Sequence, residues 1–357
     1  MKRSKISRGA SRRNFRNHAV PRLKNLKSRN MRGGIRMWKD VCIMTCLHPL
    51  FAKRSAVPNA NGKYELSNFV SYRDLSGKSL EIAKSELANN YAVVVPCGQC
   101  LGCRLDKAND WAIRCVHEAK LHLHNCFITL TYNDDCLPAD HSLHRDHLQL
   151  FFKRLRRYLD YHDTSKIRFL CCGEYGDLNR RPHYHILCFG WFPSDVRKIS
   201  ALTAGYNLFR SPTLERLWPY GYNTVGAITF ESARYVAKYS LKKQTGKNAC
   251  MYDSLGISPE FVGSSLKPGI GADYFDRYSE DIFKLGFVTI NGAKYKIPRY
   301  YQTLFERSNP VWYSIYKQNK QDNAKAAIID CKRLEAREKI MKHRQEQFER
   351  DFDNLGL

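Results

Sequence analysis

Residues 181–189 constrain the fold more than any other part of the chain. Two histidines, His183 and His185, lie one residue apart and lead into an apolar run that ends at Phe189. This pattern predicts a β-strand, and alternate side chains of a strand share one face. Both imidazoles would then point the same way, which suits a divalent metal ion because neutral imidazole is a good ligand. Taken alone, the pair also fits ordinary polar residues on a solvated strand face.

A carboxylate precedes the histidines. Glu174 follows a predicted strand, and the stretch 176–182 predicts a turn before the histidines. An antiparallel return would bring Glu174 close to His183 and His185, and Asp177 competes with it for the role of third ligand. Two nitrogens and one oxygen leave positions open for water or a phosphate oxygen. Such a set suits Mg²⁺ or Mn²⁺, and it would also hold Zn²⁺ or Ni²⁺.

Two tyrosines follow, four residues apart. Tyr235 and Tyr239 lie in segment 231–243, which predicts a helix, so both phenols would share one helical face. A phenol, with a pKa of ~10, is a weak nucleophile, and a metal ion at a phosphate would make the phosphorus easier to attack. Lys238 and Lys242 are candidates to assist phenolate formation or to neutralise the phosphate. The alternative is core packing, because 21 tyrosines make this spacing common by chance.

The cysteines Cys97, Cys100 and Cys103 have the C-x-x-C spacing of zinc knuckles. Three thiolates need a fourth ligand. We take Cys46 as that ligand, and the alternatives are His48, Cys42 and Cys115. A zinc ion would fasten the N-terminal segment to the rest of the protein without being catalytic. Buried or reactive thiols that bind no metal are the competing interpretation.

The charge balance points to a nucleic-acid partner. The chain has 59 Lys and Arg against 34 Asp and Glu, a net charge of +25, and 12% aromatic residues. Cations contact phosphates and aromatic rings stack on unpaired bases. Basic ribosomal or capsid-associated proteins share this composition, so it does not establish catalysis.

The N-terminal residues 1–36 hold 13 Lys and Arg and no acidic residue, which predicts a disordered basic arm. No apolar run approaches the roughly 20 residues of a membrane span, and no secretory signal is apparent. The 13 scattered cysteines favour a reducing cytoplasm.

We expect four parts: a basic arm at 1–40, a cysteine-containing segment at 41–120, a central domain at 121–245 and an extension at 246–357. The stretch 246–310 shows no clear period. Hydrophobic periodicity predicts strands at 126–132, 167–172, 183–189 and 224–230. It predicts helices at 105–124, 144–161, 195–203, 231–243 and, charged and solvated, 320–352.

Five blocks carry a resemblance to a known family, and they occur in the family's order: 96–104, 127–132, 173–176, 181–185 and 235–243. The chain resembles the replication initiators of microviruses, in particular the gokushovirus branch, and more broadly the HUH endonucleases. Tyr184 departs from the apolar residue that usually lies between the two histidines.

The resemblance implies an α+β fold with a central antiparallel sheet flanked by helices, RRM-like, with a cysteine-rich N-terminal segment and a helical C-terminal extension. It also implies that Glu174 is the third metal ligand and that Tyr235 and Tyr239 are the nucleophiles.

The implied activity is rolling-circle replication of single-stranded phage DNA. The enzyme would nick a strand at the origin through a 5′-phosphotyrosine intermediate, using Mg²⁺ or Mn²⁺, and later rejoin it. The implied partners are the phage origin, a host helicase and a host DNA polymerase, in the bacterial cytoplasm and without a membrane.

Two other classes compete. One is a transposase or conjugative relaxase with the same chemistry, but relaxases commonly have three histidines and an N-terminal tyrosine, whereas Tyr235 and Tyr239 follow the histidines. The other is a non-catalytic, zinc-stabilised nucleic-acid-binding protein, which would never form a covalent DNA adduct.

Overall fold

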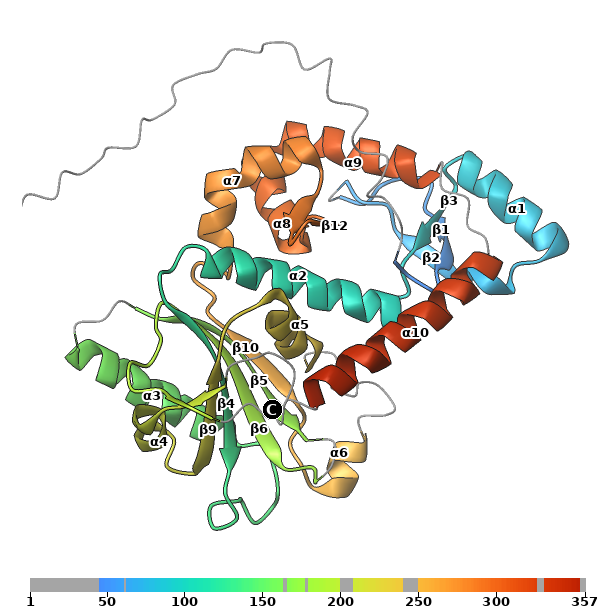
Figure 1. Ribbon diagram of the computed structural model, residues 1–357. Helices are drawn as coiled ribbons and strands as arrows, with labels where there is room; N and C mark the ends of the chain where they lie inside the picture. The colour runs from blue at the N-terminus through green and yellow to red at the C-terminus, as the bar shows by residue number, and fades with distance from the viewer. Residues whose placement is uncertain are drawn as a thin grey trace, which may run out of the picture. The chain divides into compact units, whose positions relative to one another are not determined.

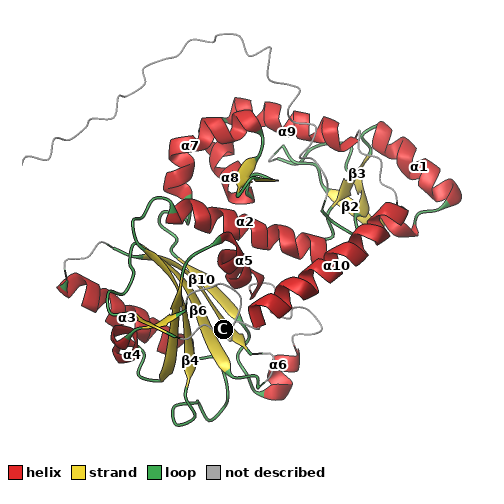
Figure 2. Ribbon diagram, in the orientation of Figure 1, coloured by secondary structure: helices red, strands yellow, loops and turns green. Residues whose placement is uncertain are grey.

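The computed structural model of the protein describes residues 45–60, 62–162, 166–176, 179–199, 208–239, 250–325 and 331–353. The predicted basic arm lies outside these ranges. Within them the chain forms a seven-stranded sheet, a three-stranded sheet, a two-stranded hairpin and several helices (Figures 1 and 2).

The seven-stranded sheet is antiparallel at each of its strand pairings, with the order β10-β5-β6-β4-β9-β8-β7. In that order the strands are Phe261–Ser264, Arg168–Tyr175, Pro182–Phe189, Asn125–Tyr132, Gly221–Gly226, Phe209–Arg210 and Arg197–Lys198. The predicted α+β class with a large antiparallel sheet flanked by helices is therefore confirmed.

Strict alternation along the central strands gives the sheet two different faces. On β6, Tyr184, Ile186 and Cys188 point into one hydrophobic core. Helices α3 (Arg145–Tyr161) and α4 (Pro212–Leu217) cover this side. The α3 stripe predicted for 144–161 is buried as expected, and Phe151 and Leu155 are fully buried.

The opposite face carries the histidines of β6, followed by Leu187 and Phe189. Helices α2 (Leu101–Ala119) and α5 (Phe230–Tyr239) pack there. Behind them the same core continues into the C-terminal part of the chain. That part contains α7 (Ala272–Leu285), β11 (Val288–Ile290), β12 (Ala293–Tyr295), α8 (Arg299–Ser308) and α9 (Pro310–Lys325).

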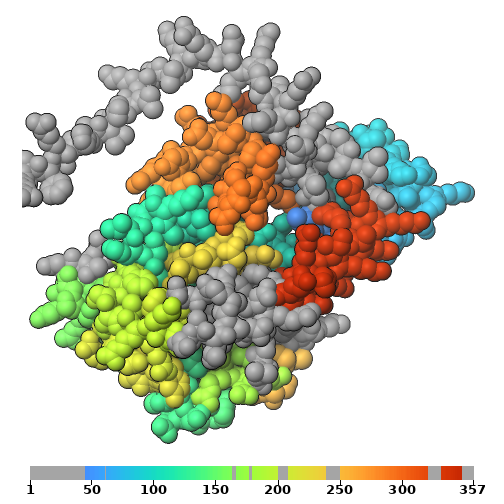
Figure 3. Space-filling view, viewed as in Figure 1, coloured from blue at the N-terminus to red at the C-terminus, as the bar shows by residue number. Residues whose placement is uncertain are grey.

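A smaller sheet forms around the cysteine segment. It has the order β2-β1-β3, with strands Leu66–Ser71, Leu50–Arg54 and Ala92–Val95, and helix α1 (Gly77–Ala88) packs on it. Helix α10 (Cys331–Asp353) joins this unit, because Glu338 forms ion pairs with Arg73 and His48. The space-filling view shows α10 as the red surface on this side of the molecule (Figure 3). Helix α6 (Cys250–Leu255) precedes β10.

Two predicted helices differ from the structure. The helix expected at 195–203 is wrong where the chain is described, because Arg197 and Lys198 form the edge strand β7. Asp195 does not begin a helix of its own; its carboxylate accepts hydrogen bonds from the Ser211 hydroxyl and the Thr213 amide at the start of α4. The charged helix expected at 320–352 is divided between α9 and α10.

Other boundaries shift. Helix α2 starts at Leu101 rather than 105 and ends at Ala119, so Cys100 is its N-cap. Strand β9 covers 221–226 rather than 224–230, because Phe230 already begins α5. The stretch 246–310, which shows no period in sequence, contains ordered helices and strands wherever it is described. No helix in the described ranges combines the length and apolar character needed to cross a membrane.

Candidate functional site

The two histidines and Glu174 lie on adjacent strands of the large sheet. Strands β5 and β6 pair antiparallel with Glu174 opposite His183 and Cys172 opposite His185. Directly opposed residues share a face, so all three side chains point to the side covered by α5. His185 and Glu174 are almost fully buried. The site is therefore held by the two central strands and not by a loop.

Strand β4 fixes the orientation of both imidazoles. The Thr129 hydroxyl lies 3.1 Å from His185 Nδ1, and the Thr131 hydroxyl lies 3.0 Å from His183 Nδ1. These threonines are directly opposite the histidines in the β4–β6 register. A hydroxyl oxygen can accept the Nδ1 proton, and that tautomer leaves the Nε2 lone pair for a metal ion.

The carboxylate is close enough to share an ion with His185. Glu174 Oε1 lies 2.7 Å from His185 Nε2. Adjacent ligands of an octahedral ion with bonds of ~2.1 Å are about 3 Å apart, so the two atoms are already near that separation. A nitrogen–oxygen donor set at this position fits Mg²⁺ or Mn²⁺.

His183 lies toward the turn that joins the two strands. Burial, followed by the nearby His185 and Arg181, lowers the pKa of His183 to about 4, so its imidazole is neutral at pH 7 and able to bind a metal. A Cβ added to Gly176 would lie only 2.8 Å from His183 Nε2. Any other residue at this position would push the imidazole aside.

Helix α5 brings one predicted nucleophile to this site. The ring of Tyr235 is 5.4 Å from the ring of His185, at an interplanar angle of 80°, and its side chain is buried. Thr229 and Ser232 cap the helix reciprocally, with amide-to-hydroxyl distances of 2.8 and 3.1 Å. The predicted cap at residues 231–232 is therefore displaced, with Thr229 as N-cap.

The other members of the predicted tyrosine helix are only partly described. Tyr239 is the last residue of α5, but its side chain lies outside the described part, and so does all of Lys242. Lys238 is on α5 and half-buried. Asp177, the competing third ligand, is also outside the described residues.

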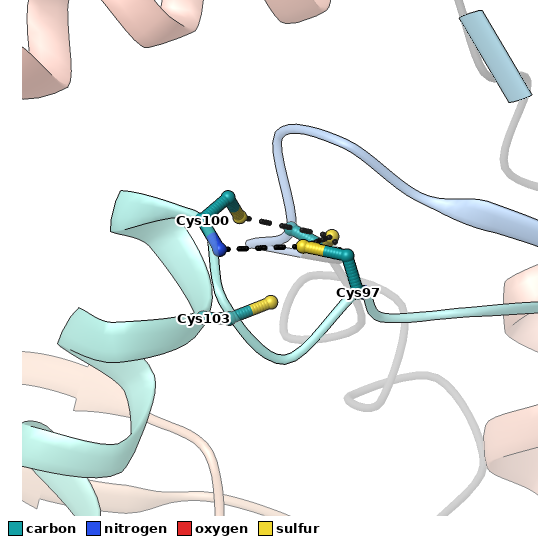
Figure 4. A group of neighbouring side chains, drawn as sticks. Cys97, Cys100 and Cys103 are labelled. Carbon is teal, nitrogen blue, oxygen red and sulfur yellow. Dashed lines mark hydrogen bonds between the residues drawn. The ribbon is translucent and has the colours of Figure 1, made fainter. Parts of the chain in front are cut away.

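The four cysteines gather into a separate cluster at the start of α2. The sulfur atoms of Cys46, Cys97, Cys100 and Cys103 all lie within 4.8 Å of one another, and Figure 4 shows the last three converging. Cys46 Sγ is 3.7 Å from Cys97 Sγ and 3.8 Å from Cys100 Sγ. Thiolates around a tetrahedral zinc ion with ~2.3 Å bonds are about 3.8 Å apart, which matches these separations.

The backbone around this cluster is arranged to support thiolates. Amides of Cys97, Leu47 and Cys100 each donate to a cysteine sulfur at 3.3 Å. Burial opposes ionisation of Cys100, but hydrogen bonds from Leu47 and Cys103 outweigh it and lower its pKa to about 6. Gly98 turns the chain between the first two cysteines with a φ of 78°.

Among the four candidates for the fourth cysteine-site ligand, the structure brings in Cys46. Cys115 lies in the core beneath α2, and His48 pairs with Glu338. Cys42 is outside the described residues. Cys46 comes from the loop before β1 and the other three from the chain leading into α2, so a shared ion would join the two sheets' segments.

Two threonines are functional candidates that the sequence reading missed. Thr129 and Thr131 alternate on β4 with fully buried Ile128 and Leu130. The signal was the pair of hydroxyl residues on the non-core positions of a strand next to the histidine strand. Without the register of β4 against β6, however, nothing in the sequence assigns each threonine to a histidine.

Fixed imidazoles, a carboxylate and a tyrosine-bearing helix on an antiparallel sheet define a candidate metal-dependent phosphoryl-transfer site. The family described as "Replication-associated protein ORF2" matches residues 125–244, which include this whole site. No solved structure matches the chain.

Relatives extend the match well beyond the site. The chain is 34% identical over 300 residues to replication-associated protein ORF2 of Spiroplasma virus 4, covering 80% of this chain and 88% of that protein. It is 36% identical over 242 residues to protein VP4 of Bdellovibrio phage phiMH2K, covering 66% and 74%. It is 36% identical over 221 residues to protein ORF4 of Chlamydia phage 1, covering 61% and 55%. The chain therefore belongs to the family of replication-associated proteins of these small phages, as its resemblance to microvirus replication initiators implied.

Proposed function

We propose that this protein nicks and rejoins single-stranded phage DNA to initiate rolling-circle replication. Its family supports a role in phage DNA replication. The net charge of +25 supports a polyanionic partner. The observation that carries the proposed chemistry is the set of contacts at one site: Glu174 with His185 at 2.7 Å, both histidines fixed by β4 hydroxyls, and the Tyr235 ring beside them.

The proposed step is a transesterification. The phenolic oxygen of Tyr235 or Tyr239 bonds to phosphorus, and the bond from phosphorus to the 3′ oxygen breaks. The phenolic proton is lost and the 3′ oxygen gains one, so the products are a 5′-phosphotyrosine and a 3′-hydroxyl. A bound Mg²⁺ or Mn²⁺ would polarise the phosphate and stabilise its developing charge. Because the phosphotyrosine is itself a phosphodiester, rejoining by a 3′-hydroxyl needs no ATP.

His183, His185 and Glu174 would hold the ion, and the two tyrosines would alternate as nucleophile and leaving group. Lys238 and Lys242 would neutralise the phosphate or assist loss of the phenolic proton. A host polymerase would extend the 3′-hydroxyl and a host helicase would open the duplex in the bacterial cytoplasm. An adduct assay on single-stranded DNA tests this proposal, because a non-catalytic DNA-binding protein forms no denaturation-resistant complex.

Removing one β4 hydroxyl should weaken metal binding without removing a ligand. In Thr129→Val the shape is nearly kept, but His185 Nδ1 loses its partner, and such outer contacts typically contribute about 10- to 100-fold in affinity. We expect the Mn²⁺ concentration for half-maximal nicking to rise at least about tenfold. The matched control is Thr224→Val, on the strand directly opposite Thr129. Equal Mn²⁺ dependence of the two variants would argue against the positioning role of Thr129.

We further propose that the cysteine cluster holds a structural Zn²⁺. Elemental analysis of reduced, purified protein should give about one zinc per chain from this cluster, and the triple variant Cys97→Ser, Cys100→Ser, Cys103→Ser should lose it. Cys136→Ser, away from the cluster, is the control and should keep the metal. A wild-type protein that contains no zinc would leave metal-free thiols as the better account.

The basic arm should contribute affinity and not chemistry. Deleting residues 1–36 removes 13 positive charges and lowers the net charge to +12. Fewer displaced counterions mean weaker binding to single-stranded DNA and a salt slope that is flatter by several units of about 0.7 per lost phosphate contact. Binding measured across a salt series gives both quantities. A deletion that unfolded the protein, or abolished nicking at saturating protein, would contradict this assignment.

A further inference from the structure

A second group of metal-ligating side chains lies on the other face of the large sheet, at the start of α3. His144 is the N-cap of that helix, and Asp146 and His147 lie in its first turn. One ligand atom from each residue lies within 4.8 Å of the other two. None of the three belongs to the proposed nicking site, whose side chains point to the α5 face.

The nitrogens that face Asp146 are the ones available to a metal. His144 Nδ1 is 3.6 Å from Asp146 Oδ1, and His147 Nε2 is 4.0 Å from Asp146 Oδ2. Ligand atoms around a tetrahedral ion with ~2.1 Å bonds are about 3.4 Å apart, so small side-chain rotations would bring all three into coordination. The two imidazole planes are tilted by only 21° with centroids 4.9 Å apart.

The remaining ring nitrogens are held by partners outside the group. His144 Nε2 lies 3.1 Å from Asp140 Oδ1, and His147 Nδ1 lies 2.8 Å from the Tyr132 hydroxyl. A carboxylate or hydroxyl on the far nitrogen is what fixes tautomer and ring direction in histidine metal ligands. Tyr132 in turn bonds the Tyr184 hydroxyl at 2.9 Å, which ties the group to the central strands β4 and β6.

We propose that His144, Asp146 and His147 form a binding site for a divalent transition-metal ion of the Zn²⁺ type. Two imidazole nitrogens and one carboxylate oxygen favour Zn²⁺ over Mg²⁺ or Ca²⁺, which prefer oxygen ligands. Remaining coordination positions face solvent and take water, because the Asp146 side chain is 68% exposed. The bound ion fastens the start of α3 to the loop that follows β4.

Zinc content of the full-length protein tests this site. After equilibration with Zn²⁺ and dialysis, the double variant His144→Ala, His147→Ala should contain one zinc fewer per chain than wild type. The control His343→Ala changes an exposed histidine on α10 and should keep the wild-type content. In Co²⁺-loaded protein, the thiolate absorption of the cysteine cluster should be the same in all three, which shows that the lost ion is not the cysteine-bound one.

A milder variant keeps the test decisive if the double variant folds poorly. Asp146→Asn alters an exposed carboxylate and keeps both imidazoles, so its far-UV circular dichroism should be unchanged. Its Zn²⁺ affinity at this site, followed by calorimetric titration, should fall at least about tenfold. Wild-type zinc affinity in Asp146→Asn, or wild-type zinc content in a folded double variant, would overturn the proposal.

Discussion

Replacing Glu174 by Gln should lower the nicking rate at least about 100-fold, as should His183→Ala or His185→Ala. Each change removes a donor at the proposed metal site, and Glu174→Gln keeps the shape of a buried side chain. Binding to single-stranded DNA should stay within about twofold of wild type, because positive charge supplies most of that affinity. Nicking of a labelled strand and a binding isotherm at fixed salt measure the two effects separately.

The control for this prediction is Asp177→Ala, which should nick normally if Glu174 is the third ligand. Wild-type rates in the histidine variants would remove the metal-site interpretation. Normal nicking by Glu174→Gln together with loss of nicking in Asp177→Ala would reassign the third ligand to Asp177.

The second large effect concerns the tyrosines. Tyr235→Phe and Tyr239→Phe should each retain some adduct formation, unequally, because one nucleophile suffices for a single nick. Each should lose efficient production of joined circles, because strand transfer needs a second phenol one helical turn away. The double Phe variant should form no adduct at all.

The matched control for the pair is Tyr222→Phe. Tyr222 is exposed and lies opposite Thr131 on β9, on the same face of the sheet as the histidines. Normal nicking and joining by this variant would separate the helix tyrosines from a tyrosine that is merely nearby. Full joining activity in either single helix variant would contradict the alternating roles of Tyr235 and Tyr239.

The central strands could be predicted because their alternation is strict. In residues 183–189 one face has histidines followed by apolar residues and the other is apolar throughout, so a single register satisfies both cores. The proximity of Glu174 to His183 followed from the same pattern, since a short turn between two strands forces an antiparallel return. The structure pairs these two residues directly.

Features that depend on long-range contacts could not be predicted in the same way. The approach of Cys46 to Cys97 joins residues 51 positions apart, and the spacing of Cys97, Cys100 and Cys103 says nothing about it. Asp195 was misread because its partners, Ser211 and Thr213, belong to another helix. The C-terminal helices share the core of α2 and α5, so their buried faces are set by that core and not by a visible period.

The most direct test of the proposed chemistry is to identify the residue that carries DNA. The protein is incubated with single-stranded phage DNA and Mn²⁺, denatured, and digested, and the DNA-linked peptide is sequenced by mass spectrometry. The account predicts a denaturation-resistant adduct with a 5′-phosphate on Tyr235 or Tyr239 and a free 3′-hydroxyl on the released strand. No adduct under these conditions, or an adduct on another tyrosine such as Tyr222 or Tyr252, would contradict it.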